Sequence, residues 1–396
     1  KLAVAGVLLV SAVAFAVQVT LQNARIRTER DRASFEGEVS GEVSDFLVGL
    51  FRLADPTETA GEVVTAEMLL SRGTSEIRAS VGSSPAVRAA LLNSMGWAWK
   101  GLGEYARARE VLEDALDAAE PGSEDAGEVL GRLALVELKL GDYDASRAHL
   151  EASLAVAEAR ADGPSAAVAR AESGFCELEY DLGRPDVALD HARRALGILE
   201  ELHGPLDEQP HPAVASAASQ LASIQELRGS IEESEALWSE VIAALRELHD
   251  GAHVDVANAQ LNRSYLYRAM GRMEDARTSV LEAKEMLEEI YGPAHPDLDS
   301  AIAQLAGIAT DTGAYDEAAR IYTDLLERDR AAYGEHLLTS LNLNDLAGIA
   351  RRKGQLDRAE EFYRAAYDMQ RRVLPENHLE LGTSASNLGT VLRRIR

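Results

Sequence analysis

Cysteine is almost absent from this chain: Cys176 is the only one in 396 residues. A single thiol excludes an intrachain disulfide and a metal site built from several thiolates. Its neighbours Phe175 and Leu178 predict a buried, inert side chain. Aromatic residues make up only 5% and prolines number 11, whereas hydrophobic residues of all kinds reach 46%. The hydrophobic residues are therefore mostly Ala, Leu and Val, which favours a thin core between closely packed helices.

Basic residues are also scarce, with Lys and Arg numbering 40 against 66 Asp and Glu, a formal net charge of −26. Phosphate backbones repel so acidic a chain, which argues against nucleic-acid binding. The motifs of common enzymes are missing as well: a Gly-rich phosphate loop, His-Glu-x-x-His, Gly-x-Ser-x-Gly and the protein-kinase catalytic motifs. We therefore expect no catalytic residue, no metal site and no cofactor in this chain.

One long hydrophobic run opens the sequence. Residues 2–21 contain no charged side chain, and twenty helical residues rise about 30 Å, the thickness of a bilayer core. We expect a transmembrane helix there and a single-pass membrane location. The arginine-rich flank after the run favours the cytoplasmic side for the rest of the chain. The alternative is a cleaved signal peptide, because Ala14-Phe15-Ala16 resembles a cleavage site.

Residues 22–84 have the pattern of a helical connector. A charged and then apolar helix ends near Asp55-Pro56, since proline cannot continue a helix. A second helix is expected from about Thr65 to Val81, with Thr65 as its N-cap.

A glycine-centred fragment then recurs along the chain, in the form Gly-x-Tyr-x-x-Ala-x-x-x-apolar-x-x-Ala-Leu. Glycine ends the first helix of a hairpin because it adopts positive φ at little cost, and the alanine five residues later suits a close approach of the paired helices. The pattern predicts an all-α, right-handed superhelical solenoid of about seven helical hairpins over residues 85–396. The repeated glycines are Gly103, Gly141, Gly183, Gly229, Gly271, Gly313 and Gly354, spaced by 38, 42, 46, 42, 42 and 41 residues.

These positions resemble the tetratricopeptide repeat family from about Val87 to Arg396. The period exceeds the usual 34 residues and is similar to the longer repeats of kinesin light chains. The resemblance implies a binding protein for peptide or protein partners, whose first helices line a concave groove.

Sites facing such a groove lie about three and ten residues before each glycine. An asparagine amide can pair with the backbone of an extended peptide, and lysine or arginine can hold a carboxylate. Other groove-facing sites hold Glu226 and Thr310, so the charge is not uniform, and the alternative is that all of them are solvated surface residues. The predicted peptide-binding residues are Asn93, Lys100, Arg268, Asn344 and Arg351.

Histidines recur with nearly the same period, at positions 211, 253, 295, 336 and 378. Metal binding or pH sensing is one interpretation of the series. Equivalent loops of stacked hairpins lie about 10 Å apart, however, and a shared ion would need bonds of about 2 Å. We therefore expect loop and helix-capping roles.

A second resemblance covers about Leu2 to Ser80. The segments 43–51, Ala54-Asp55-Pro56 and 65–73 resemble the juxtamembrane connector of bacterial transmembrane serine/threonine protein kinases that end in tetratricopeptide repeats. The resemblance implies a sensor or docking segment of such a kinase, with the repeats outside the cytoplasm. The alternative is a stand-alone anchored or secreted adaptor with no kinase attached.

Overall fold

The computed structural model describes residues 65–79, 84–293, 295, 298–374 and 378–395. These residues form sixteen helices and no strand, which confirms the predicted all-α class. The chain divides into two compact units, one ending at Pro121 and the other beginning at Gly122. The predicted transmembrane helix over residues 2–21 and most of the predicted connector lie outside the described residues.

The first unit contains three described helices, α2 (Ala66–Ala79), α3 (Pro85–Gly101) and α4 (Tyr105–Ala118). Ser84 caps α3 by accepting the N–H of Val87 at 3.2 Å, and Pro85 starts the helix where its missing N–H costs nothing. α3 and α4 form an antiparallel hairpin, and α2 packs on α3, where the indole of Trp99 donates to the Thr74 hydroxyl at 3.4 Å.

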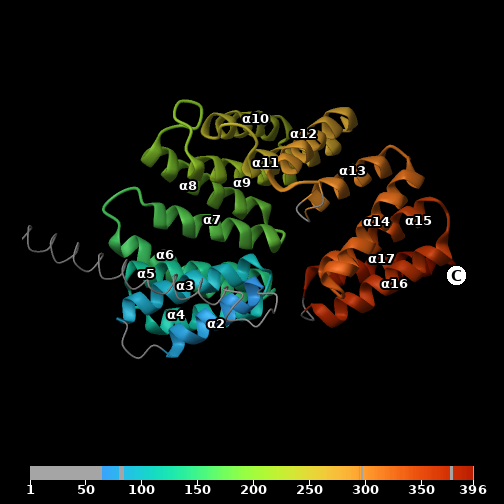
Figure 1. Ribbon diagram of the computed structural model, residues 1–396. Helices are drawn as coiled ribbons and strands as arrows, with labels where there is room; N and C mark the ends of the chain where they lie inside the picture. The colour runs from blue at the N-terminus through green and yellow to red at the C-terminus, as the bar shows by residue number, and fades with distance from the viewer. Residues whose placement is uncertain (1–64, 80–83, 294, 296–297, 375–377, 396) are drawn as a thin grey trace, which may run out of the picture. The chain divides into compact units, whose positions relative to one another are not determined.

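The second unit is a series of antiparallel hairpins, which Figure 1 shows as consecutive helix pairs from α5 to α16, followed by α17. Together with the α3–α4 pair they make seven hairpins, one for each repeated glycine. The helices are α5 (Glu124–Lys139), α6 (Tyr143–Arg160), α7 (Ala166–Asp181), α8 (Pro185–His203), α9 (Pro212–Leu227), α10 (Ile231–Leu248), α11 (Val254–Ala269), α12 (Met273–Tyr291), α13 (Asp299–Asp311), α14 (Tyr315–Tyr333), α15 (Leu337–Arg352), α16 (Leu356–Val373) and α17 (Leu379–Ile395).

All seven repeated glycines lie at the corner between the two helices of a hairpin, with φ between 68° and 83°. Each corner closes as a Schellman motif. At Gly183, for example, the glycine N–H donates to the carbonyl of Tyr180 at 2.9 Å and the next N–H donates to the carbonyl of Glu179 at 2.8 Å. The predicted role of these glycines is confirmed.

Small residues lie where the paired helices meet. The fifth position after each repeated glycine is Ala or Ser and is at most 1% exposed in every hairpin. Four residues further along the same face, a larger side chain usually fills the space between helices. The small residues are Ala108, Ser146, Ala188, Ser234, Ala276, Ala318 and Ala359, and those four positions later are Leu112, Leu150, Ala192, Trp238, Val280, Tyr322 and Tyr363, all buried.

The predicted single-pass membrane location is wrong for the part of the chain that the structure describes. No helix there is both long and apolar enough to cross a bilayer. The longest described helices, such as α8 and α12 with 19 residues each, carry acidic and basic side chains along one face.

Candidate functional site: a polar pocket on the first helices

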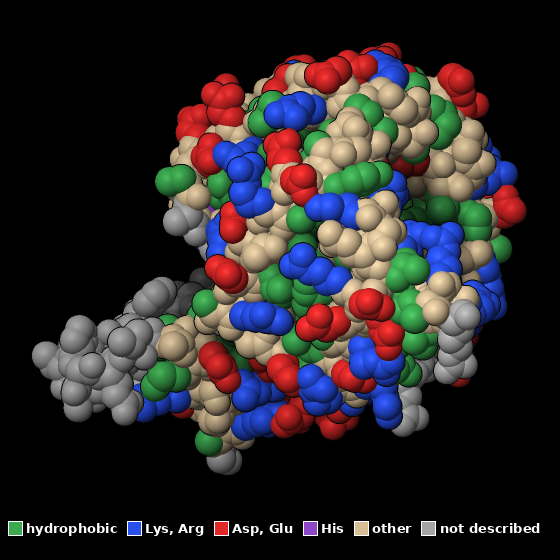
Figure 2. Space-filling model, turned by 90° about the vertical axis from the view of Figure 1, so that its right-hand side faces the viewer, with side chains coloured by type: hydrophobic (Ala, Val, Ile, Leu, Met, Phe, Trp, Pro, Cys, Tyr) green, Lys and Arg blue, Asp and Glu red, His purple; other side chains and the backbone are tan. Residues whose placement is uncertain are grey.

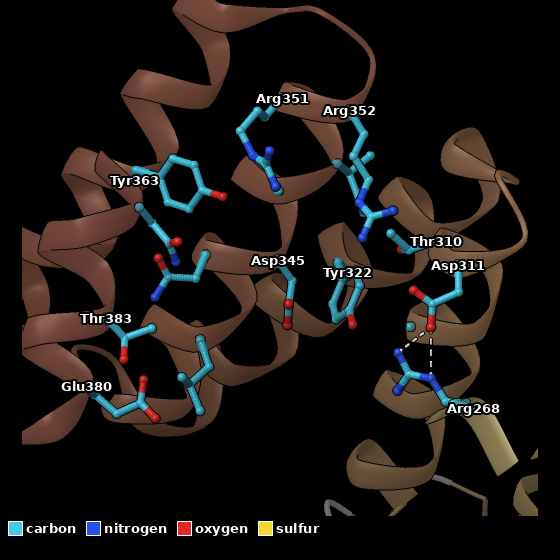
Figure 3. Close-up of a pocket in the computed structure, with 16 residues that line it drawn as sticks. Arg268, Thr310, Asp311, Tyr322, Asp345, Arg351, Arg352, Tyr363, Glu380 and Thr383 are labelled. Atoms are coloured by element: carbon cyan, nitrogen blue, oxygen red, sulfur yellow. Dashed lines mark hydrogen bonds and ion pairs between the residues drawn. The ribbon is translucent and has the colours of Figure 1, made fainter. Parts of the chain in front are cut away.

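A pocket of about 400 Å³ lies on the second unit. The first helices of three consecutive hairpins, α11, α13 and α15, line it together with α17, and α14 and α16 each add a tyrosine (Figure 3). The lining residues of α15 recur at intervals of three and four, which places them on one stripe of that helix. They are Leu341, Asn344, Asp345, Gly348, Ile349, Arg351 and Arg352.

Three of the five predicted binding residues meet in this pocket, namely Arg268, Asn344 and Arg351. The other two, Asn93 and Lys100, lie on α3 of the first unit and are not part of it. Asn93 is only 8% exposed, and the Lys100 ammonium lies 4.4 Å from the centre of the Trp97 ring. Peptide binding by any of the five stays a prediction.

Arg268 is already held by a partner within the protein. Its Nε and Nη2 donate to Oδ2 of Asp311 at 3.0 and 2.7 Å, across the gap between α11 and α13. Gly307 makes room for this pair, because a Cβ there would come within 2.9 Å of Arg268 Nη2. The guanidinium is therefore fixed and largely neutralised, which the sequence did not reveal.

Arg351 and Arg352 differ from Arg268 in this respect. Among the described residues neither guanidinium forms an ion pair or a hydrogen bond, and no dashed line reaches them in Figure 3. Arg351 is half-buried and Arg352 is exposed. The pocket thus offers two unneutralised guanidinium groups, each with several N–H donors in a fixed fork that fits a carboxylate.

Asn344 adds an acceptor beside them. Its Nδ2 donates to the Ser384 hydroxyl of α17 at 2.7 Å, whereas its buried Oδ1 has no hydrogen-bond partner in the described structure. A buried polar atom without a partner is uncommon and costly. An N–H from a bound chain would satisfy this one.

Asp345 is the functional candidate that the sequence analysis missed. Its side chain is exposed to solvent and lines the pocket, where the surrounding protein displaces part of its hydration shell. The resulting loss of hydration raises the pKa of Asp345 to about 6, and the charge of Glu380 adds to this, while Tyr322 and Arg268 oppose it. The available signal was its place directly after Asn344 on the same helical stripe.

The polar lining continues along the first helices toward α7. Tyr265 on α11 and Tyr180 on α7 are 48% and 45% exposed, so both present large aromatic surfaces to solvent. Loss of hydration nevertheless raises the pKa of both phenols and of Glu226 on α9. Exposed groups with reduced hydration are typical of a hollow surface, and the pKa of Tyr265 is also raised by Asp345 in the pocket.

Comparison with known proteins identifies the family. The tetratricopeptide repeat profile matches residues 125–201, 213–289, 255–331, 299–372 and 336–396, well over half of the chain, and a related repeat profile matches residues 88–120. This chain belongs to the tetratricopeptide repeat family.

Individual relatives are more distant. The protein Kinesin Light Chain-Related 1 of Arabidopsis thaliana is 24% identical over 273 residues, which are 66% of this chain and 43% of that protein. The match therefore spans less than half of that relative. Among solved structures, a Rap protein complexed with Competence and Sporulation Factor has 14% identity and a TM-score of 0.55, covering 89% of this chain and 98% of its own. BtubC from P. vanneervenii has 20% identity and a TM-score of 0.46, covering 57% and 91%.

Four of the five periodic histidines cap helices of these tetratricopeptide repeats. Each Nδ1 accepts a backbone N–H two residues ahead at 3.2–3.3 Å, at His211, His253, His336 and His378. This geometry agrees with the predicted capping role. It also requires an unprotonated Nδ1.

One junction between repeats gathers possible metal ligands, since His249, His253 and Asp255 each offer an atom within 4.8 Å of the other two. The two imidazole rings lie face to face, however, with centroids 3.4 Å apart and planes 3° apart. An ion binds an imidazole nitrogen in the plane of its ring, so one ion cannot bind both rings of this stack. The stack instead matches that of His203 and His211 at another junction, with centroids 3.6 Å apart.

On the face shown in Figure 2, Lys and Arg side chains lie among Asp and Glu instead of in a separate patch. Although the formal net charge of the chain is −26, this face is therefore not uniformly negative.

Reactive thiol chemistry is also disfavoured, because Cys176 is 2% exposed and burial raises its pKa to about 12.

Proposed function

We propose that this chain binds an acidic, extended segment of a partner protein along the first helices of its repeats. Tetratricopeptide repeats indicate a protein-interaction scaffold and are typically non-catalytic, which supports the absence of enzymatic activity in this chain. The observation that favours an acidic partner is the pair Arg351 and Arg352, two guanidinium groups that have no ion pair among the described residues and lie in a pocket.

The chemistry of the pocket matches such a segment. A carboxylate of the partner would pair with Arg351 or Arg352, and a backbone N–H would donate to Oδ1 of Asn344. Apolar side chains of the partner would lie against the exposed ring of Tyr265. Charged pairs of this kind contribute mainly to specificity and association rate, so we expect binding that weakens with salt.

The test uses a short labelled peptide rich in Asp and Glu, and the same peptide with Asn and Gln in their place. Fluorescence anisotropy should show tighter binding of the acidic peptide. Arg351→Glu combined with Arg352→Glu should weaken that binding at least about tenfold, which corresponds to about 1.4 kcal/mol. The matched control is Arg277→Glu, which reverses an exposed charge on α12, outside the pocket, and should change affinity less than about twofold.

Equal binding of the acidic and the amide peptide would contradict the proposal. So would unchanged affinity of the double variant when its circular dichroism spectrum shows that it is folded.

The finer function expected from the sequence, regulation of a serine/threonine protein kinase, stays a prediction. It depends on the resemblance over about residues 2–80, of which the structure describes only residues 65–79. The sequence encoded upstream of Lys1 tests it directly. A Gly-rich loop and a His-Arg-Asp stretch there would support it, and an upstream domain of another kind would defeat it.

A further inference from the structure

The charged residues that line the pocket are balanced as they stand. Three are arginines, Arg268, Arg351 and Arg352, and three are acids, Asp311, Asp345 and Glu380. With all six ionised the formal charge of the lining is zero, so an acidic ligand gains little from the pocket as a whole. The loss of one carboxylate charge would make the lining positive.

The three carboxylates are not equivalent. Asp311 is tied to Arg268 by two hydrogen bonds. Within the described residues Asp345 has no ion pair of this kind, and it lies centrally among the labelled side chains in Figure 3, with Arg351 and Arg352 on one side and Glu380 and Thr383 on the other. Asp345 is therefore the carboxylate whose charge an incoming acidic group would meet inside the pocket.

We propose that Asp345 determines the affinity of this pocket as an internal competitor of the ligand, so that acidic segments bind weakly while Asp345 is charged and tightly once it is neutral. The inference rests on the proposed function, since it concerns the same ligand and the same arginines.

The surroundings of Asp345 explain why its charge is adjustable. Low hydration and the like charge of Glu380 on α17 disfavour the carboxylate, while Arg268 on α11 and the hydroxyl of Tyr322 on α14 favour it. The other ionisable groups of the pocket are Asp311 of α13, Arg351 and Arg352 of α15 itself, and the buried phenol of Tyr363 on α16.

The direction of the pH effect is given by linkage. The pKa of Asp345 lies near 6 in the free protein, and a bound carboxylate would raise it further because like charges repel. Binding should therefore take up a proton, and affinity should rise as the pH falls through this range. Ordinary Asp and Glu residues of the peptide titrate near pH 4, so at about pH 5.5 they are still mostly charged.

The experiment compares wild type with Asp345→Asn, using the labelled acidic peptide. At about pH 7.5 the variant should bind about five- to tenfold more tightly, the size expected for one unit charge several ångströms away in a partly screened pocket. Wild type should gain a similar factor between about pH 7.5 and pH 5.5, while the variant should change by less than about twofold. Glu317→Gln, which removes an exposed charge on α14 outside the pocket, should behave as wild type.

Calorimetry gives a second and independent measurement. Titrations of the peptide near pH 6.5 in two buffers with different heats of ionisation should show proton uptake by wild type and none by Asp345→Asn. This readout does not depend on the stability of the variant, because the wild-type result alone can contradict the proposal. If the peptide binds wild type without proton uptake and without a pH slope, Asp345 is not a competitor.

These experiments distinguish a failure of the proposed function from a failure of the inference about Asp345. If the acidic peptide binds neither wild type nor Asp345→Asn, the proposed function is wrong and this inference falls with it. If binding depends on Arg351 and Arg352 but Asp345→Asn leaves both the affinity and the pH slope unchanged, only the inference about Asp345 is overturned.

Discussion

Whether a glycine inside a helix can be replaced by alanine depends on the side chains of the neighbouring helix that the added Cβ would meet. A Cβ on Gly96 would come within 2.6 Å of Cγ of Leu112, a side chain with no exposed surface. A Cβ on Gly197 of α8 would meet nothing within 4 Å. The same substitution should therefore have opposite effects at the two positions.

Gly96→Ala should lower the free energy of unfolding by about 1 kcal/mol. Overpacking costs about 1–3 kcal/mol, and the better helix propensity of alanine returns up to about 1 kcal/mol of it. Gly197→Ala keeps only the propensity gain and should raise stability by about 0.5–1 kcal/mol. Urea unfolding followed by circular dichroism measures both, and a shift of both variants in the same direction would contradict the packing argument.

At this scale the sequence predicted residue types better than their pairings. Counting from the glycines found Arg268, Asn344 and Arg351, because a helical stripe repeats with the hairpin. The count could not show that Arg268 pairs with Asp311, because the two residues lie on different hairpins. The importance of Asp345 also escaped prediction, since it depends on the hydration of a pocket that several helices build.

Whole elements were predicted more completely. The corner glycines and the capping histidines are local signals, in which a few consecutive residues decide where a helix starts or stops. The stacking of one histidine on another at the junctions was not foreseen, because the partner ring comes from the end of the preceding helix.

The start of α9 should make stability depend on pH. His211 accepts the N–H of Ala213 through Nδ1 and stacks on His203. Reduced hydration, and then the neighbouring His203, lower the pKa of His211. The folded state therefore binds this proton less readily than the unfolded state, so the stabilisation is complete above the unfolded pKa of about 6.5 and is lost as the pH falls below it.

His211→Asn tests this sign, because asparagine keeps a capping acceptor but does not titrate. Between about pH 7.5 and pH 5 the melting temperature of wild type should fall more steeply than that of the variant. The control His211→Ala removes the cap at both pH values and should be less stable than His211→Asn throughout. Parallel curves for wild type and His211→Asn would show that His211 does not contribute to the pH dependence.

On the scale of the whole molecule, the repeated pattern made the fold predictable, whereas the non-repeated run at the start of the sequence gave no comparable support. Seven copies of one pattern specify the hairpins, each of which buries its apolar side only against its neighbours. The apolar run at residues 2–21 has no such repetition behind it, and the membrane location drawn from it was wrong for the described part of the chain.

The unit from Gly122 to Arg396 should fold when expressed alone. It has its own buried clusters, including one around Trp238 and another around Tyr322. We expect a helical circular dichroism spectrum, one cooperative thermal transition, and the same affinity for the acidic peptide as the whole chain, since every residue of the pocket lies within it. Loss of the cooperative transition, or of peptide binding by a folded fragment, would contradict this.

The pocket is assembled from first helices of consecutive hairpins and from α17, so no single repeat contains it. Each hairpin of such an array is held only by its neighbours. A segment seated across these helices would tie three hairpins and α17 to one another, and its free energy of binding would add to the stability of the repeats that it bridges. Occupancy of the pocket and the local stability of α11 to α17 would then rise and fall together.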